Sequence, residues 1–265
     1  MQMIKVALIQ VNATVDIEQN ISILSKLVIE AYHGGAKMII TPEVSNFLGA
    51  TDKQKYNSLK IQNEDPCLFA LQNLSAKLGV WLLIGSLALK AEPDENQIKS
   101  FVNRSFLINP CGHIIACYDK INMFDVTLNS DQIFNESDTF QAGNQSILIK
   151  FLDTKIGLTI CYDLRFPLLF KQLSDHGANI ICVPSAFTWF TGSLHWEVLL
   201  RARAIENKVF ILAPAQCGIH GNGRKSWGHS MAIEPSGRIL VDGGIDPGIN
   251  FVDIDLSLSK GIQHG

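Results

Sequence analysis

The sequence predicts an α/β fold in which two β-sheets pack face to face and helices cover both outer surfaces, a four-layer αββα sandwich. Two observations support this prediction. Short apolar, β-branched runs alternate with amphipathic helical patterns along the chain. Each half of the chain also contains helices, apolar strands and one hairpin with a Pro-x-Gly turn. The second observation indicates a weak internal repeat with one sheet in each half.

The expected elements follow from these patterns. Strands are expected at Lys5–Gln10, Met38–Thr41, Trp81–Leu87, Val102–Ile108, His113–Tyr118, Ile147–Phe151, Lys155–Ile160, Ile180–Val183, Val209–Ala213, Ser230–Glu234, Ile239–Asp242 and Phe251–Asp255. Helices are expected at Ile17–His33, Pro66–Leu78, Pro167–His176 and Ser193–Asn207. In the first helix Ile21, Leu24 and Val28 share one face, and Gly34 ends the pattern.

Length and composition fit a globular protein. The chain has 265 residues, of which 47% are hydrophobic, which is enough for one domain over residues 1–265, although length alone also allows two small ones. A net charge of -3 gives no basic surface for nucleic acid. The longest apolar runs are strand-sized, so no membrane span is expected.

The cysteines and the N-terminal segment indicate where the protein works. The segment MQMIKVALIQVNA reads as a strand and lacks the layout of a signal peptide. None of the six cysteines forms a CxxC pair, and no Cys/His cluster has zinc-like spacing. We therefore expect reduced thiols, a cytoplasmic location and no metal.

The first candidate for chemistry is Glu43 in IITPEVSNF, which directly follows an apolar strand. Pro42 favours an extended conformation for Thr41, so Glu43 is expected at the mouth of a buried strand. The alternative interpretation is an ordinary solvated loop carboxylate.

The second and third candidates are a lysine and a cysteine. Lys120 in ACYDKINMFD lies just past a strand, where most lysines are simply exposed. Cys161 in TKIGLTICYDLRFP ends a strand, and Pro167 opens a helix soon afterwards. A sharp strand-to-helix turn exposes a nucleophile on a rigid support, and a nearby helix N-terminus favours a thiolate. The alternative is a buried, inert cysteine.

The combination of these segments resembles the carbon–nitrogen hydrolase (nitrilase) superfamily over nearly the whole chain. The matching words are TPEVSNF, YDKINMFD and CYDLRFP, together with GANIICVPSAF and HWEVLLRARAIEN. The resemblance implies the αββα sandwich, a homodimer or higher homo-oligomer, and hydrolysis of an amide, nitrile or carbamoyl C–N bond without metal or organic cofactor.

The resemblance also assigns roles to residues of this chain. Cys161 would attack the carbonyl and form a thioester, and Glu43 would be the general base. Lys120 and the backbone N–H of Tyr162 would stabilise the oxyanion. Glu136 in FNESDTF would orient Lys120, unless it is only a helix-capping or surface residue.

The segment SAFTWFTGSLHWEVLLRARAIEN most resembles the Nit branch, first its deaminated-glutathione amidases and then its ω-amidases. The expected substrate is a small anion with a terminal carboxamide, hydrolysed with release of ammonia. Expected substrate-binding residues are Tyr162, Arg165, Ser185, Phe187, Thr188 and Thr191. The cations available for its carboxylates are Arg165, Arg203, Arg224 and Lys225, although Arg203 is preferred in a structural ion pair with Glu206 or Glu197.

Two residues depart from the family pattern, and several alternatives stay open. Leu168 stands where many relatives have Glu, and Asn122 where His is frequent. The first departure concerns a helix contact and the second the choice of substrate.

A nitrilase, an N-carbamoyl hydrolase or an acyl-transferring enzyme would share the same fold and catalytic set. A catalytically silent binding protein is the alternative from another class.

Overall fold

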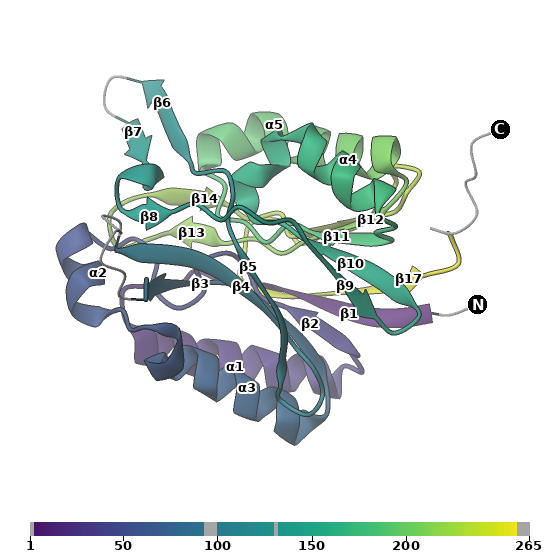
Figure 1. Ribbon diagram of the computed structural model, residues 1–265, viewed down its shortest axis with the longest axis horizontal. Helices are drawn as coiled ribbons and strands as arrows, with labels where there is room; N and C mark the ends of the chain where they lie inside the picture. The colour runs from purple at the N-terminus through teal and green to yellow at the C-terminus, as the bar shows by residue number, and fades with distance from the viewer. Residues whose placement is uncertain (1–2, 93–99, 130–131, 259–265) are drawn as a thin grey trace.

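The computed structural model describes residues 3–92, 100–129 and 132–258 of the chain. Two large β-sheets lie face to face, with α1 and α3 on the outer side of one and α4 and α5 on the outer side of the other (Figure 1). The predicted four-layer αββα sandwich is therefore confirmed.

The first sheet has the strand order β17-β1-β2-β3-β4-β5, with the short β8 paired to β4. Its strands are β1 (Met3–Gln10), β2 (Met38–Ile40), β3 (Trp81–Lys90), β4 (Phe101–Ile108), β5 (Ile114–Asp119), β8 (Phe140–Gln141) and β17 (Gly248–Asp255). Strands β1, β2 and β3 are parallel to one another. The pairs β17–β1, β3–β4 and β4–β5 are antiparallel, and β8 pairs parallel to β4.

The second sheet has the order β16-β15-β12-β11-β10-β9. Its strands are β9 (Ile147–Phe151), β10 (Thr154–Leu158), β11 (Ile180–Cys182), β12 (Phe210–Ala213), β15 (Met231–Ile233) and β16 (Ile239–Asp242). Strands β10, β11 and β12 are parallel, and the outer strands are antiparallel to them. Both sheets thus have three central parallel strands followed by a Pro-x-Gly hairpin, which is the internal repeat that the sequence indicated.

The alternation of side chains along β1 explains why the apolar runs are continuous. Val6 and Leu8 join the core between the two sheets, whereas Ala7 and Ile9 pack under the helices α1 (Ile17–His33) and α3 (Pro66–Leu78). Successive residues of a strand point to opposite faces, and both faces of this sheet are covered. Such strands are apolar at nearly every position and lose the period-two pattern.

The helix ends follow from capping. Asp16 and Asp65 accept hydrogen bonds from the first turns of α1 and α3, and both helices have the predicted bounds. Helix α4 (Pro167–Asp175) begins at its proline, as expected. Helix α5 (Trp189–Asn207) begins at Trp189 instead of Ser193, because Thr188 caps an additional turn.

Several small elements were not predicted. They are α2 (Asp52–Ser58), the β-hairpins β6 (Asp125–Asn129) with β7 (Gln132–Asn135) and β13 (Cys217–Ile219) with β14 (Lys225–Trp227), and the 3₁₀ turns Gln62–Glu64, Glu136–Asp138 and Cys161–Arg165. In Figure 1 the β6–β7 hairpin projects beside β8 and β14 at one end of the sandwich. Several of these elements border the candidate active site.

Candidate active site

Three loops from different strands bring the candidate catalytic residues together. Glu43 follows β2 of the first sheet, Lys120 follows β5 of the same sheet, and Cys161 follows β10 of the second sheet. All three side chains are buried, with Lys120 only 1% exposed. The fold brings Lys120, 77 positions away in the chain, and Ala186, 143 positions away, within hydrogen-bonding distance of Glu43.

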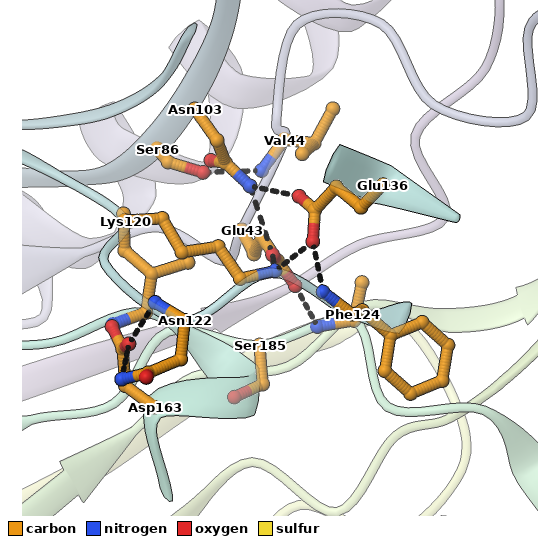
Figure 2. A network of polar contacts seen from close by, with 12 residues as sticks. Glu43, Val44, Ser86, Asn103, Lys120, Asn122, Phe124, Glu136, Asp163 and Ser185 are labelled. Carbon is orange, nitrogen blue, oxygen red and sulfur yellow. Dashed lines mark hydrogen bonds and ion pairs between the residues drawn. The ribbon is translucent and has the colours of Figure 1, made fainter. Parts of the chain in front are cut away.

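Lys120 lies between two carboxylates. Its Nζ atom is 3.0 Å from Oε1 of Glu43 and 2.7 Å from Oε2 of Glu136 (Figure 2). Burial lowers the pKa of Lys120, but the charges of Glu136 and Glu43 outweigh burial and raise it above its ordinary value. The ammonium group is therefore charged, and its position is fixed from two sides.

Cys161 lies at a sharp bend at the end of β10. Its φ of 49° is in the left-handed region, which a non-glycine residue rarely adopts. Its N–H donates to the carbonyl of Pro184 at 3.0 Å, and the bend continues into the 3₁₀ turn Cys161–Arg165. A strained strand-to-turn junction of this kind is a common support for a nucleophile.

The thiol of Cys161 and the carboxylate of Glu43 are hydrogen-bonded to each other. Burial raises the pKa of Cys161, the charge of Glu43 raises it further, and Lys120 offsets this only in part. Burial also raises the pKa of Glu43, but Lys120 and the thiol hydrogen bond outweigh it and lower that pKa overall. At rest, a neutral thiol therefore donates to an ionised carboxylate.

The expectation that a helix N-terminus favours a resting thiolate is accordingly wrong. Helix α4 begins only at Pro167, beyond the 3₁₀ turn, and Cys161 is buried beside a negative charge. The sulfur can become a nucleophile only when Glu43 accepts its proton. That arrangement is a general base paired with a thiol, which is one of the recognised ways of activating cysteine.

Sequence reasoning missed Asn103, which the structure places against both carboxylates. Its Nδ2 atom donates to Oε1 of Glu43 at 3.0 Å and to Oε1 of Glu136 at 3.2 Å (Figure 2). Asn103 is 1% exposed and lies within the strand β4. An asparagine in a strand that begins FV and ends FLI was the available signal, because buried polar groups need partners.

Backbone N–H groups complete the cluster. The N–H of Ala186 donates to Oε2 of Glu43, and that of Phe124 donates to Oε2 of Glu136, both at 2.8 Å. Gly85 permits the close packing behind Glu43, because a Cβ atom there would lie 1.9 Å from the carbonyl oxygen of Thr41. Both carboxylates are thus held in fixed orientations.

A cavity of about 310 Å³ opens onto these groups. Glu43, Lys120, Glu136 and Cys161 all line it. Of the predicted substrate-binding residues, those that line it are Tyr162, Arg165, Phe187, Thr188 and Thr191.

Ser185 differs from the prediction. It is fully buried, its hydroxyl donates to the carbonyl of Val183 at 3.0 Å, and it is not among the residues that line the cavity. It supports the backbone instead, while the next residue, Ala186, reaches Glu43. The sequence placed the lining one residue too early.

Two of the four proposed cations line the cavity, namely Arg165 and Arg224. Within the described part of the chain, neither forms an ion pair with a carboxylate. The guanidinium of Arg224 lies over the rings of Phe124 and Phe134 and donates to the carbonyl of Ala186. Its Nε atom is buried and has no hydrogen-bond partner among the residues that the structure describes.

The other two cations have structural contacts. Arg203 pairs with Glu206 at 2.8 Å and donates twice to the carbonyl of Leu164, so the preferred interpretation of a structural ion pair is confirmed. Lys225 lies over the ring of Trp189. Neither lines the cavity.

The two departures from the family pattern lie in different surroundings. Leu168 is 81% exposed on α4, away from the cavity. Asn122 donates to the buried carboxylate of Asp163 through both its backbone and its side chain. Only Asn122 is therefore in contact with the catalytic segments.

Within residues 3–92, 100–129 and 132–258, no group of three or more His, Cys, Asp or Glu side chains is placed to hold a metal ion. No helix in the same ranges has the length and apolarity needed to cross a bilayer.

Known proteins resemble this chain in sequence and in structure. A family model described as carbon-nitrogen hydrolase matches residues 5–263. The deaminated glutathione amidase of Yersinia enterocolitica is 37% identical over 236 residues, which cover 89% of this chain and 81% of that protein.

Two crystal structures have the same fold. The C. elegans NitFhit protein superposes with a TM-score of 0.88 at 30% identity; the match covers 97% of this chain, which spans 62% of that protein's length. Saccharomyces cerevisiae Nit3, described as a member of branch 10 of the nitrilase superfamily, has a TM-score of 0.85 at 28% identity, with 98% of this chain and 92% of that chain covered.

Proposed function

Because this chain belongs to the carbon–nitrogen hydrolase family, we propose that it hydrolyses the amide bond of a small anionic substrate through a cysteine thioester. The observation that carries the proposal is the contact of Cys161, Glu43 and Lys120 at the wall of one cavity. A nucleophile, a base and a fixed cation in one site are what acyl transfer requires.

The reaction begins with proton transfer from the thiol of Cys161 to Glu43, with which it is already hydrogen-bonded. The sulfur attacks the carbonyl carbon, and the ammonium of Lys120 and the N–H of Tyr162 stabilise the oxyanion. Glu43 then gives its proton to the leaving nitrogen, and a thioester remains. Water that loses a proton to Glu43 hydrolyses the thioester and restores the thiol.

Glu136 and Asn103 keep this machinery in place. Glu136 forms a second ion pair with Lys120, so the ammonium is shared between two carboxylates and does not pair with Glu43 alone. Asn103 donates to both carboxylates and favours their charged forms. Both residues therefore act through Lys120 and Glu43.

The proposed substrate is deaminated glutathione, on which the Yersinia enterocolitica relative acts according to its name. Arg165 and Arg224 line the cavity, have no carboxylate partner among the described residues, and suit the carboxylate groups of this substrate. The amides of deaminated glutathione are secondary, so an amine leaves from that substrate, and the ammonia expected from the sequence does not apply to it. Ammonia leaves only from a primary carboxamide, the substrate of an ω-amidase, which is the second candidate.

The test uses purified protein with deaminated glutathione, α-ketoglutaramate, aliphatic nitriles and N-carbamoyl amino acids. We expect turnover of deaminated glutathione with release of an amine. Ammonia release from α-ketoglutaramate alone would favour the ω-amidase. Cys161→Ala should abolish turnover while circular dichroism shows an intact fold, and activity near that of the wild type in this variant would refute the cysteine route.

A catalytically silent protein is distinguished by its thiol chemistry. Iodoacetamide should modify Cys161 in the wild type faster than Cys182, because Glu43 can accept the proton of Cys161. Cys182 is also buried and provides an internal reference, since its pKa is raised by burial alone. Equal and slow modification of both cysteines would support the silent protein.

We also propose that the protein is a homodimer in the cytoplasm. One face of α5 exposes Phe190, Leu194, Val198 and Ile205, and Leu168 is exposed on the adjacent α4. Large apolar side chains at helical spacing on neighbouring helices suit an isologous contact with a second copy. Val198→Glu should convert a dimer to a monomer in light scattering, whereas Ile23→Glu on α1 should not.

A further inference from the structure

The carboxylate of Asp163 is buried two residues after Cys161 and accepts four hydrogen bonds. Its Oδ2 atom accepts from the hydroxyl of Tyr118 at 2.7 Å and from the N–H of Ile160 at 2.8 Å. Its Oδ1 atom accepts from the backbone N–H of Asn122 at 2.9 Å and from its Nδ2 at 2.8 Å. All four partners donate, so the group acts as an ionised acceptor even though burial raises its pKa.

The four donors to this carboxylate come from two different segments, one next to Lys120 and one next to Cys161. Tyr118 lies near the end of β5 in the first sheet, two residues before Lys120, and Asn122 lies on the segment that follows β5, two residues after Lys120. Ile160 directly precedes Cys161, on the segment that leaves β10 of the second sheet. One side chain therefore connects the lysine segment to the cysteine bend across the interface between the sheets. Figure 2 shows its contact with Asn122.

If Asp163 only stabilised the turn at Cys161, it would not need the three donors from the segment around Lys120. The bond to Ile160 closes the turn at Cys161, and an asparagine could also accept it. The three donors from the lysine segment are different, because an amide at position 163 has only one oxygen and leaves some of them unpaired. Unpaired buried donors are costly, so the lysine segment would move to find other partners.

We propose that Asp163 is a positioning residue, which fixes the ammonium of Lys120 relative to the sulfur of Cys161. The inference rests on the proposed amide hydrolysis, to which it adds a determinant outside the catalytic contacts. Asn122 contributes to the same positioning, because its side chain donates one of the four hydrogen bonds that Asp163 accepts. The departure from the family pattern at this position therefore concerns alignment of the catalytic groups.

The test compares Asp163→Asn with Asp65→Asn. Asp65 is also fully buried and its pKa is likewise raised by burial, but it caps α3 and contacts neither Lys120 nor Cys161. We expect Asp163→Asn to lower kcat by about 100-fold with KM changed by less than about 3-fold, as for a misplacement of about 1 Å. Asp65→Asn should leave both constants near those of the wild type.

A second readout does not depend on turnover. The rate of Cys161 alkylation by iodoacetamide should rise with pH, and its midpoint should move to higher pH in Asp163→Asn, because a displaced Lys120 stabilises the thiolate less. The midpoint in Asp65→Asn should not move. If the wild type hydrolyses no amide, the proposed function fails, yet this pH profile still tests the alignment of Lys120 and Cys161.

The inference is overturned if folded Asp163→Asn keeps kcat within about 3-fold of the wild type, or if its alkylation midpoint is unchanged. Should Asp163→Asn not fold, Tyr118→Phe removes a single donor and keeps the ring in place. That variant should lower kcat by about 10-fold, the effect of one hydrogen bond to a charged group. An unchanged kcat in folded Tyr118→Phe would then refute the inference.

Discussion

Replacing Lys120 by methionine should destabilise the protein strongly, because two buried carboxylates would lose their common cation. Glu43 and Glu136 lie 3.0 and 2.7 Å from its Nζ atom. With an effective dielectric constant of about 20, each pair attracts by about 5–6 kcal/mol. Desolvation of the three groups offsets much of this, and removing one partner of a buried pair typically costs about 3–5 kcal/mol. We expect the free energy of unfolding at pH 8 to fall by that amount.

The loss should depend on pH. In the wild type the pKa of Glu43 lies below its ordinary 4.5, so its contribution to stability is present above that pH and is lost as the pH falls below it. In Lys120→Met, burial and the neighbouring Glu136 raise the pKa of Glu43 above 4.5. The folded variant then binds the extra proton, and its stability falls as pH rises through the raised pKa. The difference in free energy of unfolding between the wild type and Lys120→Met should be larger at pH 8 than at pH 5.

Urea unfolding of the wild type, Lys120→Met and Lys171→Met at both pH values checks this reasoning. Lys171 pairs with Asp175 on the surface of α4, where both side chains are more than half exposed. The free energy of unfolding of the control, Lys171→Met, should therefore fall by no more than about 1 kcal/mol. A loss below about 1 kcal/mol in Lys120→Met at pH 8, or an equal loss at the two pH values, would refute the assignment of Lys120 as a buried counter-ion.

Three further predictions concern the surroundings of the site. Arg224→Gln should raise KM for deaminated glutathione by about 10-fold or more in steady-state kinetics, since a charged hydrogen bond is lost, but should leave KM for a neutral amide unchanged. Gly85→Ala should lower stability by about 1–3 kcal/mol in thermal unfolding, because its Cβ would meet the carbonyl of Thr41; Gly248→Ala, with open space around its Cβ, should not. Burial lowers the pKa of His220 to about 4, so its contribution to stability is complete above pH 6.5 and declines toward pH 4, by up to about 3 kcal/mol. Urea unfolding of His220→Gln at pH 7 and pH 5 should show that this part of the pH dependence has disappeared.

The sequence was most informative where structure is determined locally. The bounds of α1 and α3 were predicted from the apolar spacing and the glycines that follow the helices, and the structure adds Asp16 and Asp65 as their N-terminal caps. Helix α2 was missed although Thr51 and Gln54 form a capping box, because the helix is short and buries no residue. The β13–β14 hairpin was missed for another reason: its strands are short and form through pairing with each other, which no local pattern reports.

The candidate site divides in the same way. Glu43, Lys120 and Cys161 each end a recognisable apolar strand, so their positions were predictable. Asn103 was not, because its role depends on how β4 aligns with loops 60 and 33 residues away in the chain. Asp163 lies in a predicted motif, yet its bond to Tyr118 joins two sheets whose relative register no local sequence pattern encodes.

The internal repeat shows why chemistry cannot be inferred from the scaffold alone. The registers of β1 with β2 and of β10 with β11 make Leu8 equivalent to Leu158, and therefore Val11 equivalent to Cys161. By the same pairing, Glu43 is equivalent to Ser185, whose hydroxyl only bonds to its own backbone. Both halves thus offer equivalent strand ends, but only Cys161, and not Val11, adopts the left-handed bend and carries a thiol, and only the opposite strand end carries a base. Because the sheets pack face to face, these two unlike positions meet, and a duplicated framework produces one asymmetric site.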